Sequence, residues 1–512
     1  MNERKHAAHI CLTLPAIYVT MAVEWMERAE KNKMTKYEVL KKYFGYDSFR
    51  EGQEMLVDAL LSGQNVLGIM PTGAGKSLCY QIPALLLPGI TLVVSPLISL
   101  MKDQVSTLNQ AGVHAAFLNS SLSAAQYRKA LGFAMEGRYK IIYVAPERLL
   151  TPEFLYAVQS MEISMISVDE AHCISQWGQD FRPSYLKITE FVDQLPTRPV
   201  IGAFTATATK EVRDDIEALL SLRDPVRLVT GFDRKNLKFT VQQPKDKFAA
   251  AESFLAEHEA DCGIIYCLTR KNVEEVCEKL EQKGYSVTRY HAGLSDLERK
   301  ENQEDFIYDR KQIMVATNAF GMGIDKSNVR WVIHYNLPKS IESFYQEIGR
   351  AGRDGLSSDT VLFYSLGDLI LLTKFATESS QQTINLEKLQ RMQQYAEADI
   401  CRRRILLSYF GETSTEDCGN CDVCKNPPQR FDGTVIVQKA LSAIARANQQ
   451  ISTGTLIDIL RGSYSAEVTA KGYQELKTFG AGRDIPPRDW QDYLLQMLQL
   501  GYFETVSYTH LR

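Results

Sequence analysis

A glycine-rich segment that ends in lysine and serine carries the clearest chemistry of the sequence. Residues 71–77 follow an apolar run at 66–70, so the pattern predicts a strand, a loop and a helix. Glycine lets backbone N–H groups curve around phosphate oxygens, and a helix N-terminus favours the anion. Met70 replaces the first glycine of G-x-x-x-x-G-K-S/T, so this is a variant phosphate loop. The predicted nucleotide contacts are Thr72, Gly73, Gly75, Lys76 on the β- and γ-phosphates, and Ser77 on Mg²⁺.

An acidic pair at the end of a later apolar run can complete this site. The run 165–169 ends in Asp169 and continues as Glu170, Ala171 and His172. At the carboxyl end of a parallel strand, Asp169 can bind Mg²⁺ and Glu170 can orient and deprotonate the attacking water. Such a pair can also be a helix cap, but the phosphate loop upstream favours the catalytic interpretation.

A polar stretch shortly before the phosphate loop is the candidate base-recognition segment. The Gln53 amide can pair with both the N6 donor and the N7 acceptor of adenine, and Tyr46 can stack on the base. Arg50 lies between them in the sequence. Taken alone, the stretch is also compatible with an ordinary turn at the start of a helix.

These residues must be positioned by a sheet, and the sequence predicts two. Short apolar runs alternate with helical stretches, as parallel sheets covered on both faces require. The pattern restarts near residue 233, and no second phosphate loop occurs there. We therefore expect a second α/β lobe that serves the same nucleotide from the opposite side. The predicted strands are 91–95, 141–145, 165–169 and 200–205, then 263–267, 287–290, 313–316, 331–335 and 361–364.

Four cysteines form a separate candidate metal site. Cys401, Cys418, Cys421 and Cys424 have the spacing C-x16-C-x2-C-x2-C. Four thiolates suit a closed, structural zinc site. An iron–sulfur cluster and a disulfide pair are the alternatives. The neighbouring arginines 402–404 form a predicted basic patch for phosphates.

The combination of these motifs resembles the superfamily 2 helicases and, in its details, the RecQ family of DNA helicases. The resemblance covers roughly residues 36 to 505. It implies an α/β fold of two RecA-like parallel-sheet lobes, followed by a helical zinc-binding subdomain and a winged helix. It also implies an ATP-dependent enzyme that uses Mg²⁺ and Zn²⁺, translocates 3′ to 5′ on single-stranded DNA and unwinds duplexes in recombination and repair. The segments that carry it are 46–53, 68–81, 93–104, 143–149, 169–183, 290–294, 316–326, 346–355 and 401–424.

The resemblance assigns further residues. Two arginines three residues apart share a helix face, and Arg353 is the predicted arginine finger, supported by Arg350 and Gln346. Asp325 is expected near the ribose, and His291 at the DNA.

An aromatic loop follows the acidic pair at 173–183. It resembles the family's loop that couples bound single-stranded DNA to ATP hydrolysis. Trp177 and Phe181 can stack on bases, and Arg182 can meet phosphates. A buried aromatic cluster is the alternative.

The last module is expected to be incomplete. Helical patterns at 435–448, 453–461 and 487–500 resemble a winged helix. Residues 503–511 are expected to supply one strand at most, which predicts weak duplex binding and poor unwinding.

Length and composition set the remaining expectations. The 512 residues, at roughly 150 per domain, predict three or four domains. The net charge of −4 gives no overall nucleic-acid signal, so a basic surface must be local. The six cysteines outside the cluster are scattered, which is typical of reduced thiols in a cytosol. The predicted divisions are an extension at 1–33, lobes at 34–230 and 231–365, a zinc subdomain at 366–427 and a winged helix at 428–512.

We expect a monomer in the bacterial cytosol or nucleoid, without membrane association. The apolar patch at 10–23 resembles a signal-peptide core, but Pro15 interrupts it and no cleavage pattern follows. The predicted partners are single-stranded DNA, forked or tailed duplexes and a single-strand-binding protein. The alternatives are an RNA helicase of the same superfamily and a DNA-binding protein whose ATPase only switches affinity.

Overall fold

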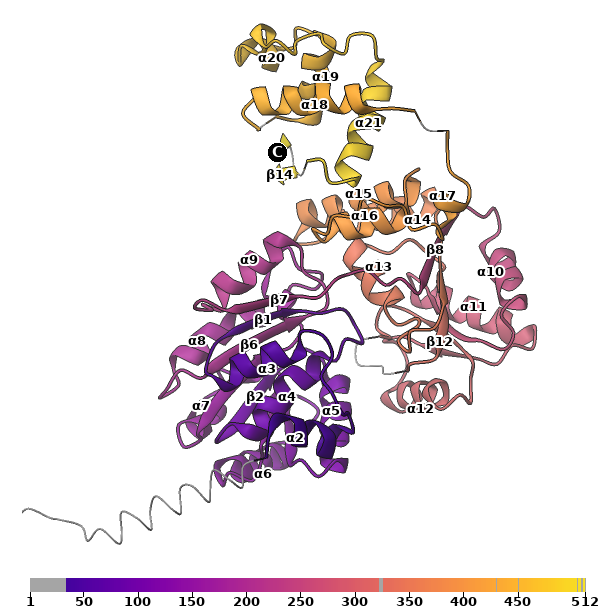
Figure 1. Cartoon of the computed structure of the whole chain (residues 1–512). Coiled ribbons are helices and arrows are strands. Elements are labelled where there is room, and N and C mark those ends of the chain that lie inside the picture. Colours follow the sequence, from indigo (N-terminus) through magenta and orange to yellow (C-terminus); the bar gives the residue numbers. More distant parts are fainter. Residues whose placement is uncertain are drawn as a thin grey trace, which may run out of the picture.

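A computed structural model describes residues 34–321, 326–429, 431–449, 451–503, 505–507 and 510–511, with side chains as far as Phe503. The extension at 1–33 and Asp325 lie outside the described residues. Figure 1 shows two α/β lobes side by side, with a layer of helices against the second lobe and a last module beyond that layer.

The first lobe is built on a seven-stranded parallel sheet in the order β3-β4-β2-β5-β6-β1-β7. Five of its strands coincide with predicted runs to within two residues, and their side chains are almost all buried because helices cover both faces. The unpredicted strands are β3, which is short, and β7, an edge strand that alternates half-buried and exposed residues. The strands are β1 (Val66–Ile69), β2 (Ile90–Val94), β3 (Ala115–Leu118), β4 (Ile141–Val144), β5 (Ile163–Val168), β6 (Val200–Thr205) and β7 (Val226–Val229).

Eight α-helices of the described chain surround this sheet. A capping box formed by Thr35 and Glu38 starts the first of them. The helix after the phosphate loop begins at Lys76, directly after the left-handed Gly75. The helices are α2 (Lys36–Phe44), α3 (Gln53–Leu61), α4 (Lys76–Leu86), α5 (Ile98–Gln110), α6 (Ala124–Met135), α7 (Pro152–Val158), α8 (Lys187–Asp193) and α9 (Lys210–Leu219).

The second lobe repeats this architecture with a six-stranded parallel sheet in the order β10-β11-β9-β12-β13-β8. All five strands predicted in this part of the chain are present, and β8 was not predicted. The strands are β8 (Leu237–Gln242), β9 (Cys262–Tyr266), β10 (Val287–Tyr290), β11 (Ile313–Ala316), β12 (Val329–His334) and β13 (Ser358–Phe363). The helices are α10 (Lys247–Ala256), α11 (Arg270–Gln282), α12 (Asp296–Ile307) and α13 (Ile341–Ile348).

A helical layer follows, made of α14 (Leu366–Thr377), α15 (Gln382–Glu397), α16 (Arg402–Tyr409) and α17 (Asp422–Lys425). One continuous apolar cluster joins it to both lobes and includes Ile69, Phe344 and Tyr395. The ring of Phe410 stacks on that of Phe232, with centroids 4.5 Å apart. The layer is therefore part of a core shared with the lobes.

The predicted basic patch at 402–404 is wrong for its first two residues. Arg402 and Arg403 are only 5% and 8% exposed. Arg402 donates to Asp422, and Arg403 donates to Asp233 (2.6 Å) and to the Leu237 carbonyl (2.7 Å). A guanidinium with buried partners joins segments of the fold and does not face a phosphate.

The last module consists of α18 (Thr434–Arg446), α19 (Thr453–Arg461), α20 (Ala466–Ala470), α21 (Pro487–Gln499), β14 (Thr505–Ser507) and β15 (His510–Leu511). Its core surrounds Trp490, whose indole N–H donates to the Gly482 carbonyl (2.9 Å). β14 and β15 pair antiparallel, with Thr505 opposite Leu511. The expectation of one strand at most is therefore wrong, because this segment supplies both arms of a short hairpin.

No helix in the described part of the chain is long and apolar enough to cross a membrane.

Candidate functional site

The phosphate loop has the backbone that its glycines predict. Gly73 and Gly75 have φ of +86° and +79°, in the left-handed region that glycine enters without strain. A Cβ at Gly75 would also clash with the Gln53 amide. The loop therefore requires glycine at position 75 for both backbone angle and space.

Lys76 is half-buried at the start of α4, and its ammonium donates to the Met70 carbonyl (3.0 Å). Burial lowers its pKa, while the charges of Glu170 and Asp169 act in the opposite direction. The lysine thus lies close to both acidic side chains. This is the arrangement that a phosphate and a divalent cation between them need.

Asp169 and Glu170 are both buried at the carboxyl end of β5. Burial, together with the Glu170 charge, raises the pKa of the Asp169 carboxyl, and Lys76 opposes this shift. Carboxylate and hydroxyl oxygens are the ligands that Mg²⁺ prefers, so Asp169 and Ser77 fit this ion. A cation there would favour the ionised carboxylates.

Glu170 is held in an unusual conformation. Its φ of +47° is left-handed, a strain of about 1–3 kcal/mol that clusters at functional sites. Its Oε2 has no hydrogen-bond partner within the described residues and lies 3.3 Å from His172 Nδ1. His172 Nδ1 shares a hydrogen bond with the Thr205 hydroxyl (2.7 Å). The candidate base is therefore connected through His172 to the end of β6.

The candidate base-recognition segment supports the loop in this structure. The Gln53 amide donates to the Ala74 and Gly75 carbonyls (3.0 and 3.2 Å) and accepts from the Arg50 N–H (2.8 Å). The Arg50 guanidinium donates to the Gly73 carbonyl (2.5 Å). Tyr46 is exposed. Recognition of adenine by these residues stays a prediction.

The second lobe meets the phosphate loop through the arginine segment. A Cβ at Gly73 would lie 3.5 Å from Arg353 Cγ, and one at Gly349 would lie 3.6 Å from Thr72 Cβ. The Arg353 charge is among the influences that lower the Lys76 pKa. Arg350 is buried against Gly321. The structure thus brings the predicted finger from lobe 2 to the loop of lobe 1.

Arg350 and Arg353 lie in the turns after α13, which ends at Ile348, so the predicted shared helix face is wrong for these two residues. We call α13 the arginine helix because it leads directly to them.

The aromatic loop contacts this helix. Gln179 donates to the Gln346 side-chain oxygen (2.8 Å). Trp177 is 37% exposed, which excludes the buried-cluster interpretation for its ring. Phe181 is half-buried, and Arg182 donates to Asp180 (2.9 Å) and to the Pro96 carbonyl (3.0 Å). No sequence pattern indicated the Gln179–Gln346 contact, since 167 residues separate the two.

His291, predicted at the DNA, is buried in this structure and is 5% exposed. Its contact with DNA stays a prediction. Its Nε2 shares a hydrogen bond with Glu274 (2.7 Å), and its Nδ1 accepts from the Gly293 N–H (3.1 Å). Both ring nitrogens are used to shape the turn after β10.

The four predicted metal ligands come together. The sulfur atoms of Cys401, Cys418, Cys421 and Cys424 all lie within 4.8 Å of one another. None is in a disulfide, so that alternative is wrong. Sulfurs around a tetrahedral zinc with Zn–S bonds of about 2.3 Å are roughly 3.8 Å apart. The cluster therefore fits a structural zinc ion.

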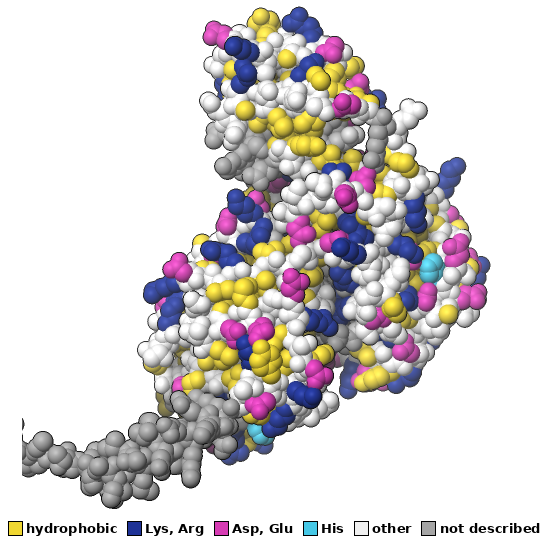
Figure 2. Space-filling view, in the orientation of Figure 1, with side chains coloured by type: hydrophobic (Ala, Val, Ile, Leu, Met, Phe, Trp, Pro, Cys, Tyr) yellow, Lys and Arg dark blue, Asp and Glu magenta, His cyan; other side chains and the backbone are white. Residues whose placement is uncertain are grey.

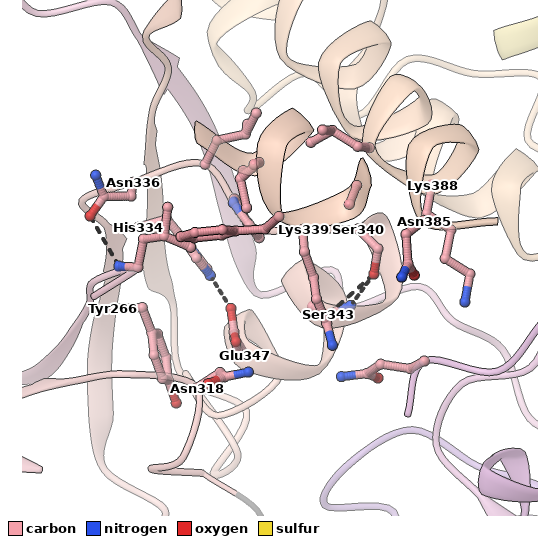
Figure 3. A pocket seen from close by; sticks show the side chains of 18 of the residues that line it. Tyr266, Asn318, His334, Asn336, Lys339, Ser340, Ser343, Glu347, Asn385 and Lys388 are labelled. Atoms are coloured by element: carbon pink, nitrogen blue, oxygen red, sulfur yellow. Dashed lines mark hydrogen bonds and ion pairs between the residues drawn. The ribbon is translucent and has the colours of Figure 1, made fainter. Parts of the chain in front are cut away.

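A cavity of about 320 Å³ opens between lobe 2 and the helical layer. Figure 3 shows Tyr266, His334 and Glu347 on one side of it, and Lys388 and Asn385 on the helix opposite. His334 shares a hydrogen bond with Glu347 (2.7 Å). The sequence did not predict this cavity, which adjoins the arginine helix and lies apart from the phosphate loop.

The fold and the site define a class of protein. Two parallel-sheet lobes, with one phosphate loop and an acidic pair in the first and an arginine finger in the second, are the architecture of ATP-dependent helicases. The sequence matches the DEAD/DEAH box helicase family at 50–215, the helicase conserved C-terminal domain at 246–355, the RecQ zinc-binding family at 366–425 and the RQC domain at 427–511.

Similar proteins agree with this class. The chain is 43% identical over 477 residues to the ATP-dependent DNA helicase RecQ of Haemophilus influenzae, covering 93% of this chain and 77% of that one. It is 44% identical over 447 residues to RecQ of Bacillus subtilis, covering 86% and 76%. In fold it resembles S. cerevisiae Dbp5 bound to RNA and ADP BeF3, with a TM-score of 0.54 and 18% identity over 71% of this chain and 92% of that one.

The chain belongs to the RecQ family of ATP-dependent DNA helicases. Its substrates are ATP and DNA, and its four-cysteine cluster is the family's zinc site, which removes the iron–sulfur alternative.

Proposed function

We propose that this helicase moves 3′ to 5′ along single-stranded DNA and unwinds tailed or forked duplexes in recombination and repair. The observation that carries the proposal is the approach of Arg353 to the phosphate loop across the lobe boundary. A site divided between two lobes couples hydrolysis to their relative motion. The direction rests on family resemblance.

At the nucleotide site each residue has a separate role. Lys76 stabilises the β- and γ-phosphate charge, and Glu170 removes a proton from the attacking water. Arg353 neutralises charge that develops on the transferred phosphoryl group, while Gln346 of α13 and Arg350 of the following turn hold the Arg353 segment in place. Ser77 and Asp169 would hold Mg²⁺, which lowers the charge repulsion between the phosphates and the nucleophile.

At the DNA side, Trp177 and Phe181 stack on bases, and Arg182 contacts a phosphate after leaving Asp180. Stacking of one base on an aromatic ring contributes about 1–3 kcal/mol. Lys and Arg side chains line the hollow between the lobes, which supports a nucleic-acid path there (Figure 2). The Gln179–Gln346 hydrogen bond gives this loop a direct route to the arginine helix.

The remaining expectations form part of the same proposal. The enzyme acts as a monomer in the cytosol or nucleoid and meets DNA coated by a single-strand-binding protein. The proposed domain limits are 34–230, 231–365, 366–427 and 428–512, and limited proteolysis should cut at these junctions first.

The decisive test is Arg353→Ala, assayed for ATP hydrolysis at saturating single-stranded DNA. Loss of a finger arginine should lower kcat by about 10³-fold or more. Arg310→Ala is the matched control, because Arg310 lies in the same lobe and pairs with Asp305 at the surface. Equal rates for both variants would contradict the assignment.

A further inference from the structure

Lys388 of α15 contacts both helicase lobes from the helical layer. Its ammonium donates to the Gly178 carbonyl of the aromatic loop (2.5 Å), 210 residues away in the sequence. The same nitrogen lies 4.0 Å from Glu342 Oε1 on α13. One side chain of the zinc subdomain thus bridges the DNA-facing loop of lobe 1 and the arginine helix of lobe 2.

The position of Lys388 is unfavourable for a charge unless it is paired. Its side chain is only 13% exposed, and burial lowers its pKa while Glu342 opposes that shift. A buried ammonium is costly without hydrogen bonds. The Gly178 carbonyl and the Glu342 carboxylate are its defined partners. These two groups stabilise the buried ammonium.

The loop end of this bridge is packed against the turn that follows the acidic pair. A Cβ at Gly178 would clash with the His172 carbonyl. Gly178 therefore lies directly against His172, two residues after Glu170. The next residue, Gln179, donates to Gln346. The loop is therefore held at residue 178 by α15 and at residue 179 by α13.

The helix end of the bridge is equally constrained. Glu342 and Gln346 are four residues apart on α13 and so share one face. The Glu342 carboxylate accepts from the Tyr409 hydroxyl of α16 (2.8 Å), and its Oε2 has no hydrogen-bond partner in the described part of the chain. The helical layer thus holds the start of α13, and α13 leads directly to Arg350 and Arg353.

We propose that Lys388 is a positioning residue that couples DNA contact at the aromatic loop to the arginine helix. It fixes the Gly178 carbonyl relative to Glu342, so that a DNA-driven shift of Trp177 moves α13 as well as the loop. The zinc subdomain then belongs to the coupling machinery as well as to the core. This inference rests on the proposed role of the aromatic loop as the DNA contact.

The test compares Lys388→Met with the matched control Lys374→Met on the neighbouring, exposed end of α14. The measured quantity is the ratio of DNA-stimulated to basal ATPase rates in the full chain. We expect Lys388→Met to lower this ratio about tenfold to a hundredfold, the range for one buried charge-assisted hydrogen bond. Lys374→Met should stay within about twofold of the parent. Lys388→Arg, which keeps the charge and donors, should restore part of the ratio.

Three further variants make every outcome decisive. Glu342→Gln and the double variant Lys388→Met/Glu342→Gln form a cycle, in which non-additive losses support the bridge and additive losses overturn it. If Lys388 only stabilises the fold, Lys388→Met should lower the melting midpoint and reduce the basal and the stimulated rates by the same factor. That result would also overturn the proposal. Trp177→Ala separates the two proposals. If Trp177→Ala keeps the parent's ratio of stimulated to basal rate, the proposed role of the aromatic loop is wrong. If Trp177→Ala lowers this ratio and Lys388→Met does not, only the proposed role of Lys388 is wrong.

Discussion

Arg403→Met should lower the stability of the enzyme without changing its affinity for DNA. The substitution keeps an apolar stem against the Phe239 ring, 5.3 Å from the guanidinium, and removes only the charge and donors. It leaves the Asp233 carboxylate and the Leu237 carbonyl without the donor that joins α16 to the start of lobe 2.

The structure sets the size of the effect. Breaking a buried ion pair costs about 3–5 kcal/mol, and one hydrogen bond to a charged group is worth about 1.5–3 kcal/mol. The Asp233 side chain is 30% exposed, so water can replace part of its lost partner. We therefore expect a loss of about 3 kcal/mol, at the lower end of the ion-pair range.

Guanidinium unfolding and DNA binding at several salt concentrations measure the two effects separately. A phosphate contact on single-stranded DNA contributes about 0.7 to the slope of log K against log salt. We expect an unchanged slope and an earlier unfolding transition. Arg310→Met, which replaces an exposed arginine, is the control for the loss of one positive charge. Normal stability with a slope smaller by about 0.7 would refute the structural role and restore the predicted phosphate contact.

Three other substitutions give distinct results. Lys76→Ala should abolish DNA-stimulated ATP hydrolysis because it removes the phosphate-binding charge, and a rate near that of the parent in a steady-state assay would contradict its role. Gly75→Ala should weaken nucleotide binding, because the φ of +79° and the nearby Gln53 amide both disfavour a Cβ. Titration with a fluorescent nucleotide measures this effect. Gly63→Ala is the control for backbone strain alone, because a Cβ at Gly63 would meet open space. Cys421→Ser should release zinc and expose residues 401–424 to protease, because thiolate ligation contributes on the order of 10 kcal/mol to folding. Elemental analysis that finds one zinc per chain in a protease-resistant Cys421→Ser protein would disprove this.

Much of the fold followed from local patterns because parallel strands buried on both faces are continuous apolar runs. β1, β9 and β11 are of this kind, and they were predicted nearly to the residue. β7 was missed because it is an edge strand with one side in partial contact with solvent, so its residues alternate. The last hairpin was missed because the pairing of β14 with β15 depends on a chain reversal that short polar segments do not specify.

The arrangement of the candidate site was predictable where the sequence pattern leaves a residue only one structural role. Gly75, Lys76 and the four cysteines are such cases. Arg403 was misassigned because a charged side chain can stabilise the fold as well as bind a ligand, and only burial distinguishes the two uses.

Contacts between distant segments left no trace in the sequence. Gln179 meets Gln346, and Lys388 meets Gly178, only after both lobes and the helical layer have folded. The types of these residues indicate nothing about such partners.

Strand separation on a tailed duplex tests the central claim most directly. A fluorescently labelled DNA duplex with a 3′ single-stranded tail is mixed with enzyme, ATP and Mg²⁺, beside the same duplex with a 5′ tail, an RNA duplex with a 3′ tail, and the Glu170→Gln variant. We predict ATP-dependent release of the labelled strand from the 3′-tailed DNA alone, and no release by the variant. ATP hydrolysis stimulated by single-stranded DNA without any strand release would contradict the account and identify an ATPase that only switches its affinity for DNA.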